Sequence, residues 1–165
     1  MINRCLATAF ALVLAYGLPA TAQPLNDSVY LCTKEFSGGL AYDAKTKKWH
    51  STTFKPDGKF VLRLKYTGQI IEKTFGSEKI AYYQYDIMLT PAGTSEEYSC
   101  IDPGGRKTVS IRDRLYFRCA SLSGYYAFDL QNNRFLQAYL EGYVGGRDNN
   151  DDTPFVAGGT CSKIQ

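Results

Sequence analysis

Apolar and polar side chains alternate with a period of two along much of this chain. The clearest stretch, 60–66, repeats apolar side chains at every second position: Phe60, Leu62, Leu64 and Tyr66. Similar stretches cover 80–89 and 109–119, where Asp113 is the one charged residue on an inner face. A β-strand turns alternate side chains to one face, so this period predicts half-buried strands over all three ranges.

Turn motifs separate these stretches. Pro and Gly cluster in Lys55-Pro56-Asp57-Gly58, Thr90-Pro91-Ala92-Gly93 and Asp102-Pro103-Gly104-Gly105. The chain also holds 13 Tyr and 9 Phe, residue types that favour pleated surfaces over helices. The sequence therefore predicts an all-β fold, an antiparallel barrel or sandwich of about 8–9 strands.

Two segments share the pattern G-x-x-A-[aromatic]-D-x4-[basic]-[aromatic]. The first runs over 38–49 and the second over 124–135, each residue displaced by 86 positions. The pattern predicts two similar hairpins, in which Tyr42 meets Trp49 and Phe128 meets Phe135 across the strands. An Asp in each copy would close the turn through its own backbone. Residues 135–143 would also suit a short helix, and the repeat favours a strand there.

The N-terminus has the order of a secretory signal peptide. Arg4 precedes an apolar run over 6–18, and Ala20-Thr21-Ala22 supplies small residues before a cleavage point at Gln23. The apolar run is too short to span a bilayer, which needs roughly 20 residues. We expect a signal peptide over 1–22, a single β domain over 23–165, no membrane span, and a periplasmic or secreted location.

Cleavage after Ala22 would remove Cys5 and leave four cysteines: Cys32, Cys100, Cys119 and Cys161. Four cysteines in an exported chain predict two disulfides. A zinc site would favour close pairs such as C-x-x-C, which these spacings lack. Because one cysteine precedes each copy of the repeat, we expect the pairs Cys32–Cys100 and Cys119–Cys161, although four cysteines permit three pairings.

A family resemblance rests on motifs at both ends of the predicted domain. They are Cys32, Gly38–Tyr42, Lys48-Trp49, Phe54–Pro56, Lys59-Phe60, Arg134–Leu136, Gly142-Tyr143, Asp148–Pro154 and Gly159–Cys161. With these motifs the chain resembles small exported two-disulfide proteins of Gram-negative bacteria. The resemblance spans most of residues 23–165. It implies export and carries over no activity.

Catalytic motifs are not evident. His50 is the one histidine, and no G-x-S-x-G nucleophile accompanies it, so we expect a solvent-facing strand residue. With its cysteines bridged, the chain would offer no thiolate. The formal net charge of +3 does not indicate a nucleic-acid partner.

We therefore expect a monomeric, exported, non-enzymatic binding module. Its partner would be an unknown protein or small ligand outside the cytoplasm, and it could act as a periplasmic protein inhibitor or an envelope-associated factor. Polar loops on rigid β scaffolds commonly bind partners. Two alternatives stay open: a small β-barrel that holds an apolar small molecule, and a hydrolase that uses carboxylates from separate strands.

No cofactor is expected, with calcium as the one candidate. Asp148, Asn150 and Asp152 stand at alternate positions, as the first ligands of an EF-hand loop do. Thr153 then replaces the glycine that such a loop requires, so other oxygens, for example from Asp129 or Glu141, would have to complete a site. The favoured alternative is a polar loop whose Asx side chains cap its own turns.

Overall fold

The computed structural model describes residues 26–112, 115–122 and 124–165, and these residues form ten β-strands. The predicted signal peptide, 1–22, and Asp113 lie outside them. The strands in chain order are β1 (Ser28–Asp43), β2 (Lys48–Phe54), β3 (Lys59–Phe75), β4 (Glu78–Pro91), β5 (Tyr98–Ser99), β6 (Val109–Ile111), β7 (Tyr116–Ser121), β8 (Gly124–Asp129), β9 (Arg134–Tyr139) and β10 (Phe155–Lys163).

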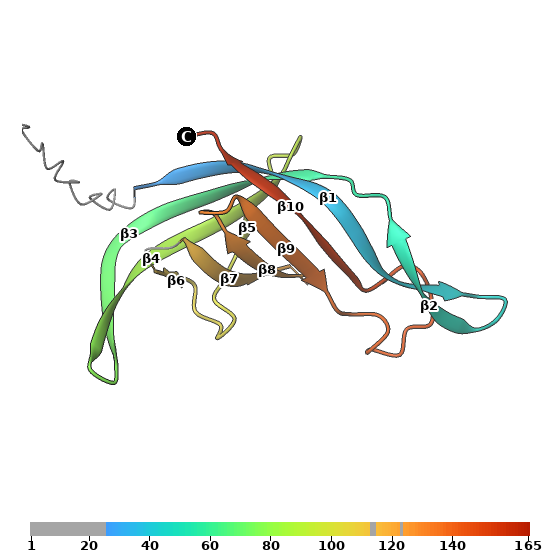
Figure 1. Cartoon of the computed structure of the whole chain (residues 1–165). Coiled ribbons are helices and arrows are strands. Elements are labelled where there is room, and N and C mark those ends of the chain that lie inside the picture. The colour runs from blue at the N-terminus through green and yellow to red at the C-terminus, as the bar shows by residue number, and fades with distance from the viewer. Residues whose placement is uncertain (1–25, 113–114, 123) are drawn as a thin grey trace, which may run out of the picture.

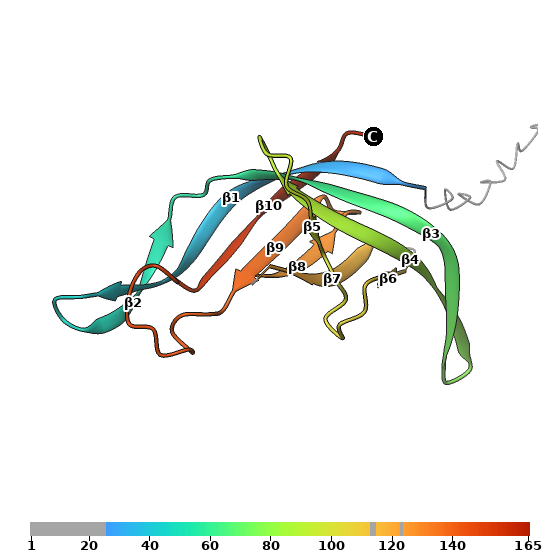
Figure 2. The same ribbon diagram turned by 180° about the vertical axis from the view of Figure 1, so that it is seen from behind.

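All ten strands belong to one antiparallel sheet with the order β5-β4-β3-β1-β10-β9-β8-β7, while β2 pairs with β1 and β6 with β4. The sheet is strongly curled, so that β7–β9 lie beneath β3 and β4 (Figure 1). The view from behind shows the same two layers (Figure 2). The edges touch at one isolated bridge, Ile101 to Ala120, with two hydrogen bonds of 2.8 Å. The sheet is therefore sandwich-like and does not close into a continuous barrel.

The all-β prediction is confirmed, with two differences in detail. The strand predicted over 109–119 is divided into β6 and β7. The two-residue strand β5 is too short to show an alternating pattern. These short strands raise the count to ten.

The hydrophobic core fills the space inside the curl. It is built from the inward faces of both layers, including Leu62, Leu64, Tyr85, Ile87, Ile111, Phe117, Phe128 and Phe135. Phe60 contacts Phe135 edge-on, with 5.1 Å between ring centroids, and Phe117 stacks on Phe128 at 4.9 Å. The inner faces predicted from the alternation on β3, β4, β6 and β7 are the faces that pack here.

The two predicted hairpins are confirmed. Tyr42 lies opposite Trp49 in β1–β2, with ring centroids 5.5 Å apart. Phe128 lies opposite Phe135 in β8–β9, at 6.1 Å. Residues 134–139 form strand β9 and not a helix. The β8–β9 pair lies in the core, whereas the β1–β2 hairpin projects beyond the sheet (Figure 1).

The two turns are closed by matching aspartates, as predicted. The Asp43 Oδ1 atom accepts a hydrogen bond from the backbone N–H of Lys45 at 2.8 Å, and the Asp129 Oδ1 atom accepts one from Asn132 at 3.0 Å. The last residue of each turn, Lys47 in one and Asn133 in the other, has a positive φ, of 54° and 55°. Hydrogen bonds lower the pKa of both carboxyl groups. The bond from Lys45 has the largest effect on Asp43, and hydrogen bonding from Asn132 has the largest effect on Asp129.

Two disulfides form, but the predicted pairing is wrong. Cys32 is bonded to Cys161, and Cys100 to Cys119. Cys32 and Cys161 lie opposite each other on the neighbouring strands β1 and β10. The prediction failed because the structural repeat does not include the cysteines. Cys32 lies on β1, the same strand as Tyr42, whereas Cys119 lies on β7, one strand before Phe128.

Two disulfides fit a protein outside the reducing cytoplasm. In the described part of the chain, no helix has the length and apolar character needed to cross a membrane.

Candidate functional site

The outer face of β8–β10 and β1 carries a row of apolar positions. Four of these positions are paired in succession across the strands: Ala127, Leu136, Gly158 and Phe36. The next row holds Tyr125, Ala138 and Val156 in the same manner. These positions alternate with core residues, so their side chains point away from the core. An apolar surface therefore covers four strands on the side where alternation predicts polar residues, and on β7 the matching position is Arg118.

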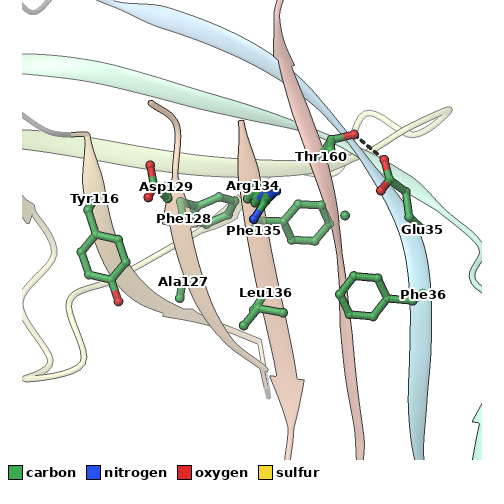
Figure 3. Close-up of a pocket in the computed structure, with 11 residues that line it drawn as sticks. Glu35, Phe36, Tyr116, Ala127, Phe128, Asp129, Arg134, Phe135, Leu136 and Thr160 are labelled. Atoms are coloured by element: carbon green, nitrogen blue, oxygen red, sulfur yellow. Dashed lines mark hydrogen bonds between the residues drawn. The ribbon is translucent and has the colours of Figure 1, made fainter. Parts of the chain in front are cut away.

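This surface is hollowed into a groove of about 530 Å³, called the outer groove below. Its apolar walls are Phe36, Tyr116, Ala127 and Leu136, which come from β1, β7, β8 and β9 (Figure 3). Gly158 lies in β10 between Phe36 and Leu136. Because glycine has no side chain, the Phe36 ring and the Leu136 side chain lie close over this position and bury it.

The walls of the outer groove are exposed to an unusual degree for apolar side chains on neighbouring strands. Phe36 is 55% exposed, Leu136 49% and Tyr116 47%. Single exposed apolar residues are normal on protein surfaces, whereas contiguous ones mark interaction sites. The outer groove is therefore the strongest candidate for a binding surface in the described residues.

A β-bulge shapes one end of the groove. The β1–β10 register shifts between Lys34 and Phe36, and Glu35 is the extra residue. Its Oε1 atom accepts a hydrogen bond of 2.5 Å from the hydroxyl of Thr160 (Figure 3). The shift turns Phe36 to the outer face, where regular alternation from Cys32 would have placed an inward residue.

Charged residues line the edge of the groove, and the two acids there already have internal partners. Glu35 is held by Thr160, and Asp129 by the side chain and backbone of Asn132. Arg134 lines the same edge and is exposed. On the neighbouring strand the Arg118 Nε atom donates to the hydroxyl of Tyr116 at 3.1 Å. Thr160 and Asn132 are neutral donors, so both acids keep their charge and the edge presents two carboxylates beside two guanidinium groups.

The three residues predicted as calcium ligands lie together in the loop before β10, and each contacts another part of the protein. Asp148 accepts a hydrogen bond of 2.8 Å from the indole of Trp49. Asn150 accepts from the backbone N–H of Tyr42 and donates to its carbonyl, at 2.7 and 2.8 Å. Asp152 pairs with Arg147 at 2.6 Å and accepts from the hydroxyl of Tyr139. The loop thus binds the β1–β2 hairpin, and calcium binding stays the alternative to a polar loop that serves structure alone.

The one histidine and the possible metal ligands are the other candidates from the sequence. His50 lies exposed on β2 opposite Ala41, in agreement with the expected solvent-facing strand residue. Among the described residues, no three His, Cys, Asp or Glu side chains gather where they could hold a metal ion.

Comparison with family models, with curated proteins and with solved structures finds no match to this chain. The proposed function is therefore derived from the geometry of the outer groove.

The sequence does not single out the residues of the outer groove as a binding site. One signal could have found them: β10 reads Phe-Val-Ala-Gly-Gly-Thr-Cys, which is apolar or small on both faces over its first five residues. A strand of that kind is usually covered on both sides. Here only the inner side is covered.

Proposed function

We propose that this protein is an exported, non-enzymatic binding module that holds a protein partner on the outer groove. The exposure of Phe36, Leu136 and Tyr116 in one groove lined by five strands carries the proposal. Covering such side chains releases about 25 cal/mol for each Å² of apolar surface removed from water. A rigid sheet also loses little conformational entropy on binding, which favours affinity.

The charged residues at the edge of the outer groove favour a partner that carries a carboxylate. Glu35 and Asp129 are engaged within the protein, whereas Arg134 and Arg118 present guanidinium groups beside apolar walls. A partner with an apolar side chain next to a carboxylate would cover Phe36 and Leu136 and meet an arginine. A periplasmic inhibitor and an envelope-associated factor would both use such a contact.

The small-molecule barrel receives less support. Its requirement is an interior cavity of roughly 300 Å³ or more. The interior is packed with aromatic rings, and the hollow that lies between the layers has a volume of about 170 Å³. Within the described residues, the interior therefore has no room for an apolar ligand of the size that a barrel chamber holds, whereas the exposed surface can bind a protein.

The hydrolase alternative also receives less support. Glu35 and Asp129 both line the groove, but β10 and β9 lie between their strands. Three strand spacings of about 4.8 Å place the two backbones roughly 14 Å apart. Glycosidase carboxylate pairs lie about 5–9.5 Å apart. In addition, the pKa of Asp129 is lowered by Asn132, which opposes a role as proton donor.

The test uses the oxidised protein as bait in a Gram-negative envelope extract, together with two variants. Leu136→Lys places a charge in the groove, and Val144→Lys places the same charge at an exposed residue of the β9–β10 loop that does not line the groove. Each captured protein is identified and purified, and its affinity is measured. We expect one that binds wild type and Val144→Lys equally and Leu136→Lys at least about tenfold more weakly. Equal affinity for all three baits would overturn the proposal.

A further inference from the structure

A second, smaller hollow lies between the two layers of the sheet, at the end where β3 begins and β7 ends. Its volume is about 170 Å³. Phe60, Leu89 and Tyr126 contribute apolar walls from β3, β4 and β8. Ser121, Gln137 and Lys34 add polar groups from β7, β9 and β1. This inner pocket shares none of the groove's apolar wall residues and is independent of the proposed function.

Two buried polar atoms at the inner pocket have no hydrogen-bond partner among the described residues. They are the Oγ atom of Ser121 and the Oε1 atom of Gln137. Ser121 is only 6% exposed. A buried hydroxyl or amide oxygen without a partner costs free energy, so native proteins usually satisfy such atoms. Both residues line the pocket, so a partner bound there would reach the two atoms through a rotation of their side chains.

The hydroxyl of Tyr126 completes this polar end. It accepts a hydrogen bond of 3.0 Å from the Nε2 atom of Gln137, which leaves its own proton for another acceptor. Burial raises the pKa of Tyr126, so the hydroxyl keeps that proton at neutral pH. The three groups together offer two donors and an acceptor, which match a hydroxyl group of a ligand.

A positive charge borders the same pocket. Lys34 follows Cys32 by two residues on β1, so its side chain starts on the inner face. It is half-buried, and its Nζ atom lies 5.8 Å from the ring centroid of Phe155. None of the ion pairs that the described residues form includes Lys34. An anionic group at the mouth of the pocket would give this ammonium a partner.

We propose that the inner pocket binds a small organic acid with a hydroxyl group at one end, an apolar body and a carboxylate at the other end. The hydroxyl would meet Ser121 and Gln137, the body would lie against Phe60 and Leu89, and the carboxylate would face Lys34. A volume of about 170 Å³ holds on the order of ten non-hydrogen atoms at most. Hydroxybenzoates have this size and pattern.

The test titrates the oxidised protein with 4-hydroxybenzoate and follows backbone amide resonances by NMR. Two probes each lack one end: 4-methylbenzoate lacks the hydroxyl, and phenol lacks the carboxylate. We expect saturable shifts at Ser121, Tyr126 and Gln137, and about tenfold weaker binding of each truncated probe. Lack of saturation with 4-hydroxybenzoate, or shifts centred on Leu136 and Gly158, would overturn the assignment.

Three variants identify the contacts. Lys34→Gln should weaken binding of 4-hydroxybenzoate about tenfold, while Lys65→Gln, the same change on the exposed side of β3, should leave it unchanged. Ser121→Ala should weaken binding of 4-hydroxybenzoate and leave 4-methylbenzoate unaffected. Spectra of the free variants establish that each is folded. Unchanged affinity in both Lys34→Gln and Ser121→Ala would contradict the proposal.

Discussion

Gly158 lies directly beneath Phe36 on the outer face of the sheet. A Cβ atom at Gly158 would stand 2.4 Å from the Cζ atom of the Phe36 ring and 2.8 Å from the Cδ2 atom of Leu136. Both atoms are the far ends of exposed side chains, so they can move aside. The absence of a side chain at Gly158 thus lets Phe36 and Leu136 lie close over β10, without being required for the fold.

The neighbouring Gly159 provides a matched comparison. A Cβ atom there would lie 1.9 Å from the backbone oxygen of Thr33, which cannot move without disrupting the β1–β10 pairing. We expect Gly159→Ala to lower the free energy of unfolding by about 3 kcal/mol or more, and Gly158→Ala to change it by less than about 1 kcal/mol. Urea denaturation of both variants measures this, and equal losses would contradict the assigned faces.

The two disulfides should contribute unequally to stability. Cys32–Cys161 links residues 129 positions apart, whereas Cys100–Cys119 links residues 19 apart. From loop-closure entropy, removing the first by paired alanine substitutions costs about 5 kcal/mol, and removing the second about 3 kcal/mol. Thermal denaturation of the two double variants tests the order. Non-reducing peptide mapping that recovered Cys32 joined to Cys100 would contradict the connectivity.

Tyr85 should make the fold sensitive to alkaline pH. Burial raises its pKa from 10.0 to about 12, and its hydroxyl has no partner among the described residues. The folded state therefore keeps a proton that the unfolded state loses. The stabilisation is complete below pH 10 and is lost as the pH rises towards 12. We expect the free energy of unfolding to fall less steeply over this range in Tyr85→Phe than in wild type. An equal slope of the free energy of unfolding against pH in the two proteins would contradict the role of Tyr85.

Asn150 should hold the 140–154 loop against the β1–β2 hairpin. Asn150→Ala removes both hydrogen bonds to the backbone of Tyr42, so we expect a loss of about 1–2 kcal/mol in the free energy of unfolding. Asn149→Ala is the nearby control, because Asn149 bonds within the loop to Asp151. Equal effects of the two variants would show that the contact with Tyr42 contributes little.

Calcium binding has its own test in the same loop. Asp148, Asn150 and Asp152 already bond to Trp49, Tyr42 and Arg147, so we expect equal melting midpoints with millimolar Ca²⁺ and with a chelator. A ligand that binds only the folded state must raise its stability. A higher midpoint with Ca²⁺ would restore the calcium site.

Local features of the fold could be predicted from the sequence. The Tyr42–Trp49 and Phe128–Phe135 pairs follow from short hairpins, in which a four-residue turn sets the register. The inner faces of β3 and β4 follow from alternation. Each of these predictions depends on residues that are close together in the chain.

Long-range features could not be predicted in the same way. The Cys32–Cys161 bond requires the first and last strands to pair, and no local pattern encodes that neighbour relationship. The outer groove depends on the bulge at Glu35, which turns Phe36 outward, and on cross-strand rows from four strands. The inner pocket similarly joins Lys34 to Ser121 and Gln137 only through tertiary packing.

The most direct test of the binding surface is site-specific photocross-linking in the envelope of a Gram-negative host. A photoreactive phenylalanine derivative replaces Leu136 in one protein and Ile71, an exposed residue of the β3–β4 hairpin, in a control. We predict a covalent adduct with another protein from position 136 and none from position 71. No adduct from position 136, an adduct joining two copies of this chain, or the same adduct from both positions would contradict the proposed protein-binding groove.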